Sequence, residues 1–138
     1  MSPNKNHYVL IMAGGIGSRF WPVSKKSFPK QFIDILGVGK SLLQLTYERF
    51  LKIVPKEHIF IVTNADYEDI VKQQLPDLAD HQILKEPMRR NTAPCIAYVS
   101  AKIYSINPQA NLVVAPSDHL VMNTPEFTRI INKALDHV

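Results

Sequence analysis

The residues with the clearest capacity for chemistry form a glycine-rich segment, Ala13-Gly-Gly-Ile-Gly-Ser-Arg19. Glycines let a ligand approach the backbone closely, and successive backbone N–H groups form a concave site that binds anions. Arg19 adds a planar cation, and Lys30 in the later stretch Pro29-Lys-Gln-Phe32 adds a compact one. These groups suit a phosphate ligand whose charge must be held and neutralised. A glycine turn with solvated surface cations is the alternative interpretation.

Two common phosphate-binding motifs do not fit this part of the sequence. The dinucleotide pattern G-x-G-x-x-G, started at Gly15 and Gly17, meets Phe20 where its third glycine is required. The stretch Gly39-Lys40-Ser41 ends like a P-loop, but Asp34 occupies the position of the first glycine. We therefore expect Gly39 in a loop that precedes a helix.

A second polar segment, Glu86-Pro-Met-Arg-Arg-Asn-Thr-Ala-Pro94, precedes another predicted helix. Asn91 or Thr92 could cap that helix, a structural role that contributes about 1 kcal/mol. The same helix N-terminus could instead present Asn91 and backbone groups to a base or a ribose. Its expected place at the edge of a sheet favours the ligand-binding interpretation.

A third segment, Ala115-Pro-Ser-Asp-His119, places Asp118 directly after a predicted buried strand. Mg²⁺ usually takes one or two protein carboxylates and completes its shell with phosphate oxygens and water. Asp118 is therefore a candidate metal ligand, with an ordinary turn residue as the alternative.

The elements that must position these residues alternate along the chain. Four apolar runs predict buried strands: Tyr8-Val-Leu-Ile-Met-Ala13, Ile59-Phe-Ile-Val-Thr63, Gln82-Ile-Leu-Lys85 and Leu112-Val-Val-Ala115. Helices are predicted from Ser41 to a stop at Pro55, from Asp66 to Leu75, from Thr92 to Ile106, and from a start at Thr124-Pro125-Glu126. In the third helix, one stripe would contain Ile96, Val99, Ile103 and Ile106. In the last helix, Thr124 is the expected cap.

This alternation predicts an α/β sandwich, a mostly parallel sheet with right-handed crossovers and helices on both faces. In such sheets, ligands bind outside the carboxyl ends of the strands. Four segments follow strands and are expected there: Gly14 to Lys30, Thr63 to Asp66, Glu86 to Thr92, and Pro116 to His119.

Composition excludes several classes of protein. The chain has 138 residues, 46% of them hydrophobic and 20% charged, which predicts one globular domain over residues 1–138. A single cysteine excludes a disulfide framework, and the histidines lack metal-ligand spacing. With no apolar run near ~20 residues and a polar N-terminus, we expect a cytoplasmic protein without a membrane segment. The net charge of +4 favours anionic ligands, but the cations lack the interleaved aromatics of nucleic-acid binders.

Taken together, the ordered motifs closely resemble the mannose-1-phosphate guanylyltransferase family. The motifs are Gly14-Gly-Ile-Gly-Ser-Arg19, Trp21-Pro22, Pro29-Lys-Gln-Phe32, Glu86-Pro87, Arg90-Asn-Thr-Ala-Pro94 and Pro116-Ser-Asp-His119. The resemblance implies a Rossmann-like nucleotidyltransferase fold and the reaction of GTP with mannose 1-phosphate to give GDP-mannose and pyrophosphate. It implies Mg²⁺ as cofactor, held by Asp118, with Arg19 on the β and γ phosphates and Lys30 on the α phosphate. The nucleotide-binding residues it implies are Ala13, Gly14, Gly15, Gly17, Ser18, Arg19, Lys30, Glu86, Asn91 and Thr92.

Members of that family are longer, so the chain resembles their N-terminal portion, the half that carries GTP and Mg²⁺. We expect an exposed sheet edge or apolar patch where a remainder would pack. Two alternatives stay open: a non-catalytic nucleotide-binding module for regulation or assembly, and a nucleotidyltransferase for another sugar phosphate or base. Base preference rests on the resemblance alone, and the oligomeric state, a homo-oligomer included, is left open.

Overall fold

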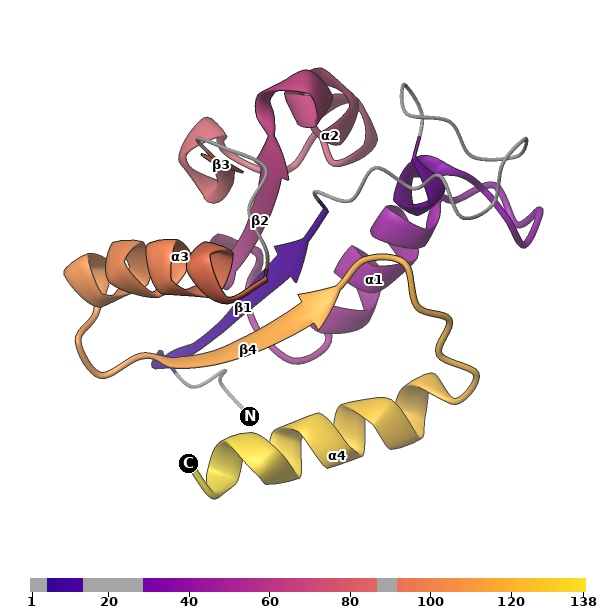
Figure 1. The fold of residues 1–138 in the computed structure, drawn as a ribbon. Coiled ribbons are helices and arrows are strands. Elements are labelled where there is room, and N and C mark those ends of the chain that lie inside the picture. Colours follow the sequence, from indigo (N-terminus) through magenta and orange to yellow (C-terminus); the bar gives the residue numbers. More distant parts are fainter. Residues whose placement is uncertain (1–4, 14–28, 87–91) are drawn as a thin grey trace.

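A parallel sheet organises the structure. The computed structural model describes residues 5–13, 29–86 and 92–138 (Figure 1). The strands in this part of the chain are β1 (His7–Met12), β2 (Ile59–Asn64), β3 (Ile83–Glu86) and β4 (Asn111–Pro116). Each neighbouring pair is parallel, in the order β3-β2-β1-β4. The predicted strands are confirmed, with boundaries that move by no more than one residue.

Helices connect and follow the strands. They are α1 (Leu42–Leu51), α2 (Glu68–Gln74), α3 (Thr92–Ile106) and α4 (Thr124–Asp136). Short 3₁₀ turns lie at Lys30–Phe32, Lys56–His58, Ala65–Tyr67 and Asp80–Gln82. Among the described residues, no helix is both long enough and apolar enough to cross a membrane.

Both faces of the sheet carry a packed core, because successive side chains of a strand point to opposite faces. On one face, Val9 and Ile11 of β1 pack with apolar residues of α1, α2 and α4. On the other face, Tyr8 and Leu10 pack with apolar residues of α3. All six residues of β2 are buried, as expected for a parallel strand covered on both sides. The predicted fold, a parallel sheet with helices on both faces, is confirmed (Figure 1).

The loop before α1 explains why the P-loop pattern fails. The carboxylate of Asp34 accepts hydrogen bonds from the amides of Val38 at 3.0 Å and Gly39 at 2.7 Å. Gly39 has a φ of +85°, which places it in the expected loop. These amides are therefore bound by a carboxylate of the chain itself. Helix α1 then begins with a capping box, in which the Ser41 hydroxyl accepts from the Gln44 amide at 3.2 Å.

Two helix boundaries differ from the prediction. Helix α1 ends at Leu51, before the expected stop at Pro55. The predicted helix from Asp66 begins instead as a 3₁₀ turn, and α2 follows from Glu68 to Gln74. The side chain of Asn64 causes this tight start, because its Oδ1 accepts a hydrogen bond from the Asp66 amide at 2.9 Å.

The expected cap of the last helix is wrong by one residue. The side chain of Asn123, not of Thr124, accepts a hydrogen bond from the Glu126 amide, at 3.1 Å. Asn reaches the amide three residues on, and it is among the strongest N-cap residues. Pro125 lies in the first turn, where its missing N–H removes no hydrogen bond.

The predicted apolar stripe of α3 is only partly buried. Val99 and Ile103 are fully buried against the sheet. Ile106, expected on the same stripe, is 57% exposed. Ile106 is the last residue of the helix, so the apolar stripe extends beyond the surface against which α3 packs.

The two outer strands of the described sheet are β3 and β4. β4 pairs with β1 on one side, and all six of its residues are half-buried, whereas those of β2 are buried. β4 is thus an edge strand among the described strands, and an exposed edge for a remainder stays a prediction. Nearby, beyond the end of this strand, Leu120 and Met122 are exposed.

Candidate functional site

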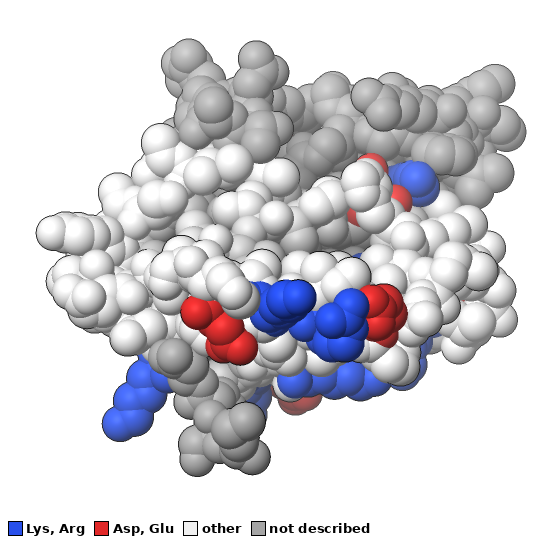
Figure 2. Space-filling view, turned by 90° about the horizontal axis from the view of Figure 1, so that it is seen from below, with Lys and Arg blue, Asp and Glu red and all other residues white. Residues whose placement is uncertain are grey.

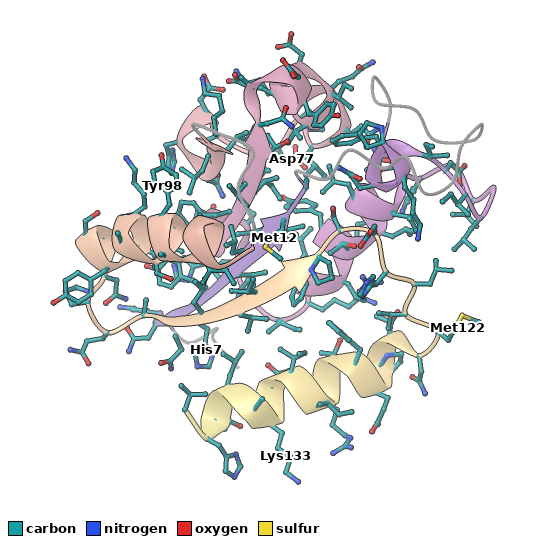
Figure 3. The ribbon with its side chains drawn as sticks, viewed as in Figure 1. His7, Met12, Asp77, Tyr98, Met122 and Lys133 are labelled. Carbon is teal, nitrogen blue, oxygen red and sulfur yellow. The ribbon has the colours of Figure 1, made fainter. Side chains whose placement is uncertain are left out.

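The carboxyl ends of the strands bring the predicted segments to one edge of the sheet. In the strand register, Met12 at the end of β1 lies opposite Val62 of β2 and Pro116 of β4. Asn64 at the end of β2 lies opposite Glu86 at the end of β3. Figure 3 labels Met12 at this edge, with His7 at the opposite end of the same strand.

Buried hydrogen bonds join the strand ends at this edge. The amide of Ala13 donates to the Val62 carbonyl at 2.8 Å, and the Ala13 carbonyl accepts from the Thr63 hydroxyl at 2.8 Å. The Met12 carbonyl accepts from the Ser117 hydroxyl at 2.7 Å and from the Ser117 amide at 3.2 Å. Thr63, Ser117 and Ala13 are all essentially buried. The end of β1 is thus bonded to both of its neighbours.

Asp118 follows Ser117 at the carboxyl edge, as the sequence predicts. Its side chain is 46% exposed, and the Nε2 of His119 lies 3.7 Å from its Oδ1. A half-exposed carboxylate at the carboxyl edge has the oxygen donors that Mg²⁺ prefers, and one such ligand suffices when phosphate oxygens complete the shell. Within the described residues, no cluster of three or more His, Cys, Asp or Glu side chains forms a further metal site. The residues present fit a magnesium ion shared with a phosphate ligand.

Lys30 begins a 3₁₀ turn that is fastened to α1 and α2. The ring of Phe32 in this turn packs against Tyr67 with 5.6 Å between centroids. The side-chain Nε2 of Gln74 donates to the Phe32 carbonyl at 3.0 Å. The Oε1 of the same side chain accepts from the Ser41 hydroxyl at 2.6 Å. Gln74 therefore connects the turn of Lys30 to the start of α1.

The remaining predicted site residues divide into two groups. Glu86 ends β3 and Thr92 begins α3, so both stand at element ends, as expected. The other predicted positions lie outside the described residues: Gly14, Gly15, Gly17, Ser18, Arg19 and Asn91.

Three polar residues at this edge were not singled out individually from the sequence. Thr63 and Ser117 bond the end of β1, and Asn64 is 6% exposed at the end of β2. The Nδ2 of Asn64 has no hydrogen-bond partner among the described residues, although its Oδ1 is bonded. In the sequence, each of these residues is a polar residue at or next to the end of an apolar run that predicts a strand. That pattern predicts its place at the edge but not its hydrogen-bond partner.

On the face of the molecule that carries α4, charge is mixed (Figure 2). Figure 2, which looks at the molecule from below Figure 1, shows Lys and Arg beside Asp and Glu. On α4, Arg129 pairs with Glu126 through its Nε at 3.0 Å. The expectation of an anion site therefore concerns the carboxyl edge and not this face.

Beneath α4 lies a buried cation. Arg49 of α1 is 8% exposed, and burial lowers the pKa of its guanidinium below the ordinary value. The guanidinium lies over the ring of Phe127 at 5.3 Å and donates to the Thr46 hydroxyl at 3.1 Å. Its contacts link α1 to α4, so we assign it to packing.

Comparison with known proteins assigns the family. Residues 8–137 match the family described as Nucleotidyl transferase. The chain belongs to this family. For a nucleotidyl transferase with this sheet order, the carboxyl edge is also where the fold class binds its ligands.

Among similar nucleotidyl transferases, the alginate biosynthesis protein AlgA of Pseudomonas putida is 40% identical over 124 residues, 88% of this chain and 25% of that protein. The mannose-1-phosphate guanylyltransferase of Salmonella montevideo is 37% identical over 127 residues, 91% of this chain and 26% of that protein. The resemblance to mannose-1-phosphate guanylyltransferases is confirmed. The chain spans about a quarter of the length of these curated relatives.

Solved structures agree on the fold. The crystal structure named mannose-1-phosphate geranyltransferase from Thermus thermophilus superposes with a TM-score of 0.81 and 31% identity, over 96% of this chain and 38% of that one. The structure of mannose-6-phosphate isomerase from Helicobacter pylori gives a TM-score of 0.69 and 25% identity, over 95% of this chain and 46% of that one.

Proposed function

We propose that the protein transfers GMP from GTP to mannose 1-phosphate, giving GDP-mannose and pyrophosphate, and that this chain carries the part that binds GTP and Mg²⁺. The observation that carries the proposal is the presence of Asp118 and of the start of the glycine-rich segment at one sheet edge, in a nucleotidyl transferase whose relatives include a protein named mannose-1-phosphate guanylyltransferase. The proposed partners are the two small-molecule substrates.

The proposed reaction is an in-line displacement. A phosphate oxygen of mannose 1-phosphate forms a bond to the α phosphorus, and the bond from that phosphorus to the bridging oxygen breaks, so that its electron pair leaves with pyrophosphate. Such a transfer requires positioning and neutralisation of charge more than a covalent catalyst. A bound Mg²⁺ would neutralise phosphate charge and orient the phosphates. Asp118 would hold it, and Arg19 and Lys30 would hold the phosphate oxygens.

A product assay tests the proposal. The purified intact gene product is incubated with mannose 1-phosphate and each of GTP, ATP, UTP and CTP, with and without Mg²⁺, and nucleotide sugars are separated by anion-exchange chromatography. We expect GDP-mannose and an equal amount of pyrophosphate from GTP, only with Mg²⁺. Turnover with another nucleotide or sugar phosphate would reassign the substrate. Nucleotide binding without any turnover would favour a regulatory or assembly module.

Substitution of two lysines, one at a time, distinguishes a specific phosphate-binding role from a general effect of positive charge. We expect Lys30→Ala to lower turnover at least tenfold, in the range typical for lost electrostatic groups at an active site. The control is Lys40→Ala, which removes an exposed lysine that pairs with Glu48 at 2.7 Å. Equal losses in the two variants would contradict a specific role for Lys30.

A further inference from the structure

At the end of β1, two successive carbonyls accept hydrogen bonds from side-chain hydroxyls, the Met12 carbonyl in addition to a backbone bond. The Met12 carbonyl accepts from Ser117, which follows β4, and the Ala13 carbonyl accepts from Thr63 near the end of β2. One hydroxyl thus comes from each of the two strands that flank β1. The two donors lie far apart in the sequence and share no element; only the sheet register brings them to the same point.

The Ser117 hydroxyl does more than satisfy a buried carbonyl. The Met12 carbonyl already accepts from the Ser117 amide at 3.2 Å, so the hydroxyl bond at 2.7 Å is a second bond from the same residue. Two bonds from one residue to one oxygen fix the orientation of that residue. At 2% exposure, water does not compete for either bond. The next residue along the chain is Asp118.

We propose that Thr63 and Ser117 are positioning residues that fix Asp118 relative to Met12 and Ala13, from which the glycine-rich segment departs; this inference rests on the proposed function. Phosphoryl transfer depends on the placement of metal and phosphates, and a displacement of about 1 Å can cost a hundredfold in rate. The two hydroxyls hold the strand ends that carry the metal ligand and the phosphate-binding segment. Both side chains are buried and bonded to backbone carbonyls.

The test compares hydroxyl deletions at the edge with a matched deletion elsewhere. Thr63→Val and Ser117→Ala remove the two bonds, and Thr63→Ser keeps the first hydroxyl. The control is Thr46→Val, because the buried Thr46 hydroxyl also donates to a backbone carbonyl at 2.8 Å, but inside α1. For each variant of the intact gene product we measure the melting temperature, kcat, and calorimetric binding of inorganic tripolyphosphate with and without Mg²⁺.

We expect Thr63→Val and Ser117→Ala to lower kcat by about tenfold or more, the usual range for groups that orient metal ligands. Thr46→Val should lose melting temperature without losing kcat, and Thr63→Ser should recover most of the rate. Tripolyphosphate should bind the wild type with Mg²⁺ and bind both edge variants more weakly.

Two results would overturn the inference. One is a kcat and a tripolyphosphate affinity in the edge variants equal to those of Thr46→Val, with only stability lost. The other is absence of tripolyphosphate binding to the wild type. If the carboxyl edge bound no phosphate, the two hydroxyls could not act by positioning a phosphate site. Failure of the proposed function is distinct: the wild type would then bind tripolyphosphate yet form no GDP-mannose, and the edge variants would still be compared by that binding.

Discussion

At the amino ends of the strands, side-chain hydrogen bonds to the backbone and stacked rings close the sheet. At the carboxyl ends, hydroxyls also bond the backbone, but polar groups beside them are half-exposed or lack a described partner. At the amino end, the Gln82 amide nitrogen donates to the Ile59 carbonyl at 2.8 Å, and its oxygen accepts from the Ala79 amide at 3.0 Å. The His58 ring stacks on Tyr8 with 4.3 Å between centroids. These contacts stabilise the fold and present little to a ligand.

The carboxyl end uses the same kind of bond for another purpose. Thr63 and Ser117 bond carbonyls of β1, but beside them Asp118 is half-exposed and the Nδ2 of Asn64 has no partner among the described residues. Rigid backbone next to uncommitted polar groups is the arrangement expected of a binding site. The difference indicates that substitutions at the amino end cost stability, and that those at the carboxyl end cost function.

The largest expected effect comes from Asp118→Asn, which removes a charge and keeps the shape. We expect turnover to fall by about a hundredfold or more, because a main electrostatic group of the reaction is lost. The melting temperature should change by no more than about 2 °C, since the side chain is half-exposed and makes no buried hydrogen bond to the residues that the structure describes. Asp136→Asn at the exposed end of α4 is the control. Wild-type turnover in Asp118→Asn would contradict the conclusion that substitutions at the carboxyl end impair function.

Gln82→Leu should have the opposite effects, a loss of stability without a loss of turnover. It removes the side-chain bonds to the Ile59 and Lys56 carbonyls and to the Ala79 amide, although the Lys56 carbonyl keeps its bond from the Ile59 amide. We therefore expect a loss of about 3 kcal/mol in the free energy of unfolding. Turnover per folded molecule should stay at the wild-type value. Denaturant unfolding followed by circular dichroism measures the first quantity, with the exposed Gln109→Leu as control. A lower kcat at full folding would mean that the amino end is coupled to the site.

The smallest effect concerns a surface ion network beside β3. Hydrogen bonds from Lys72 at 3.0 Å and from Lys85 at 3.2 Å hold the pKa of Glu68 below its ordinary value. A lowered folded pKa means that Glu68 contributes stability above its unfolded pKa of about 4.3, and that the contribution disappears as the pH falls through the folded value. Glu68→Gln should therefore melt slightly below the wild type at pH 7, and the difference should shrink as the pH falls below the unfolded pKa and through the folded one. A difference in melting temperature that persists at acid pH would exclude the lowered pKa of Glu68 as its cause.

Much of the fold followed from local patterns. The apolar runs placed all four described strands to within one residue, because a parallel strand buried on both faces leaves little room for polar residues. The boundaries that failed depended on single side chains. Asn123 displaced Thr124 as the cap of α4, and Asn64 turned the start of the second helix into a 3₁₀ turn.

For the site, the sequence could name residue types but not their partners. It predicted that Ala13 and Asp118 would reach the carboxyl edge, and the strand register brings them there. It could not predict that Ser117 bonds Met12 or that Thr63 bonds Ala13, because these pairs are 105 and 50 residues apart and depend on the order of strands. The base recognised by the site likewise follows from no single residue of the described edge.

The sheet order also bears on how the chain folds during synthesis. Among the described strands, β1 is made first and lies inside the sheet, yet its pairing of His7 with Asn111 needs a strand about a hundred residues later. Until then the residues Val9 to Ile11, wholly buried in the native state, have one sheet edge open. Non-local pairing of this kind slows folding and prolongs exposure of apolar surface. We therefore expect nascent chains arrested before β4 to depend on chaperones, and those that extend past Pro116 to be released from them.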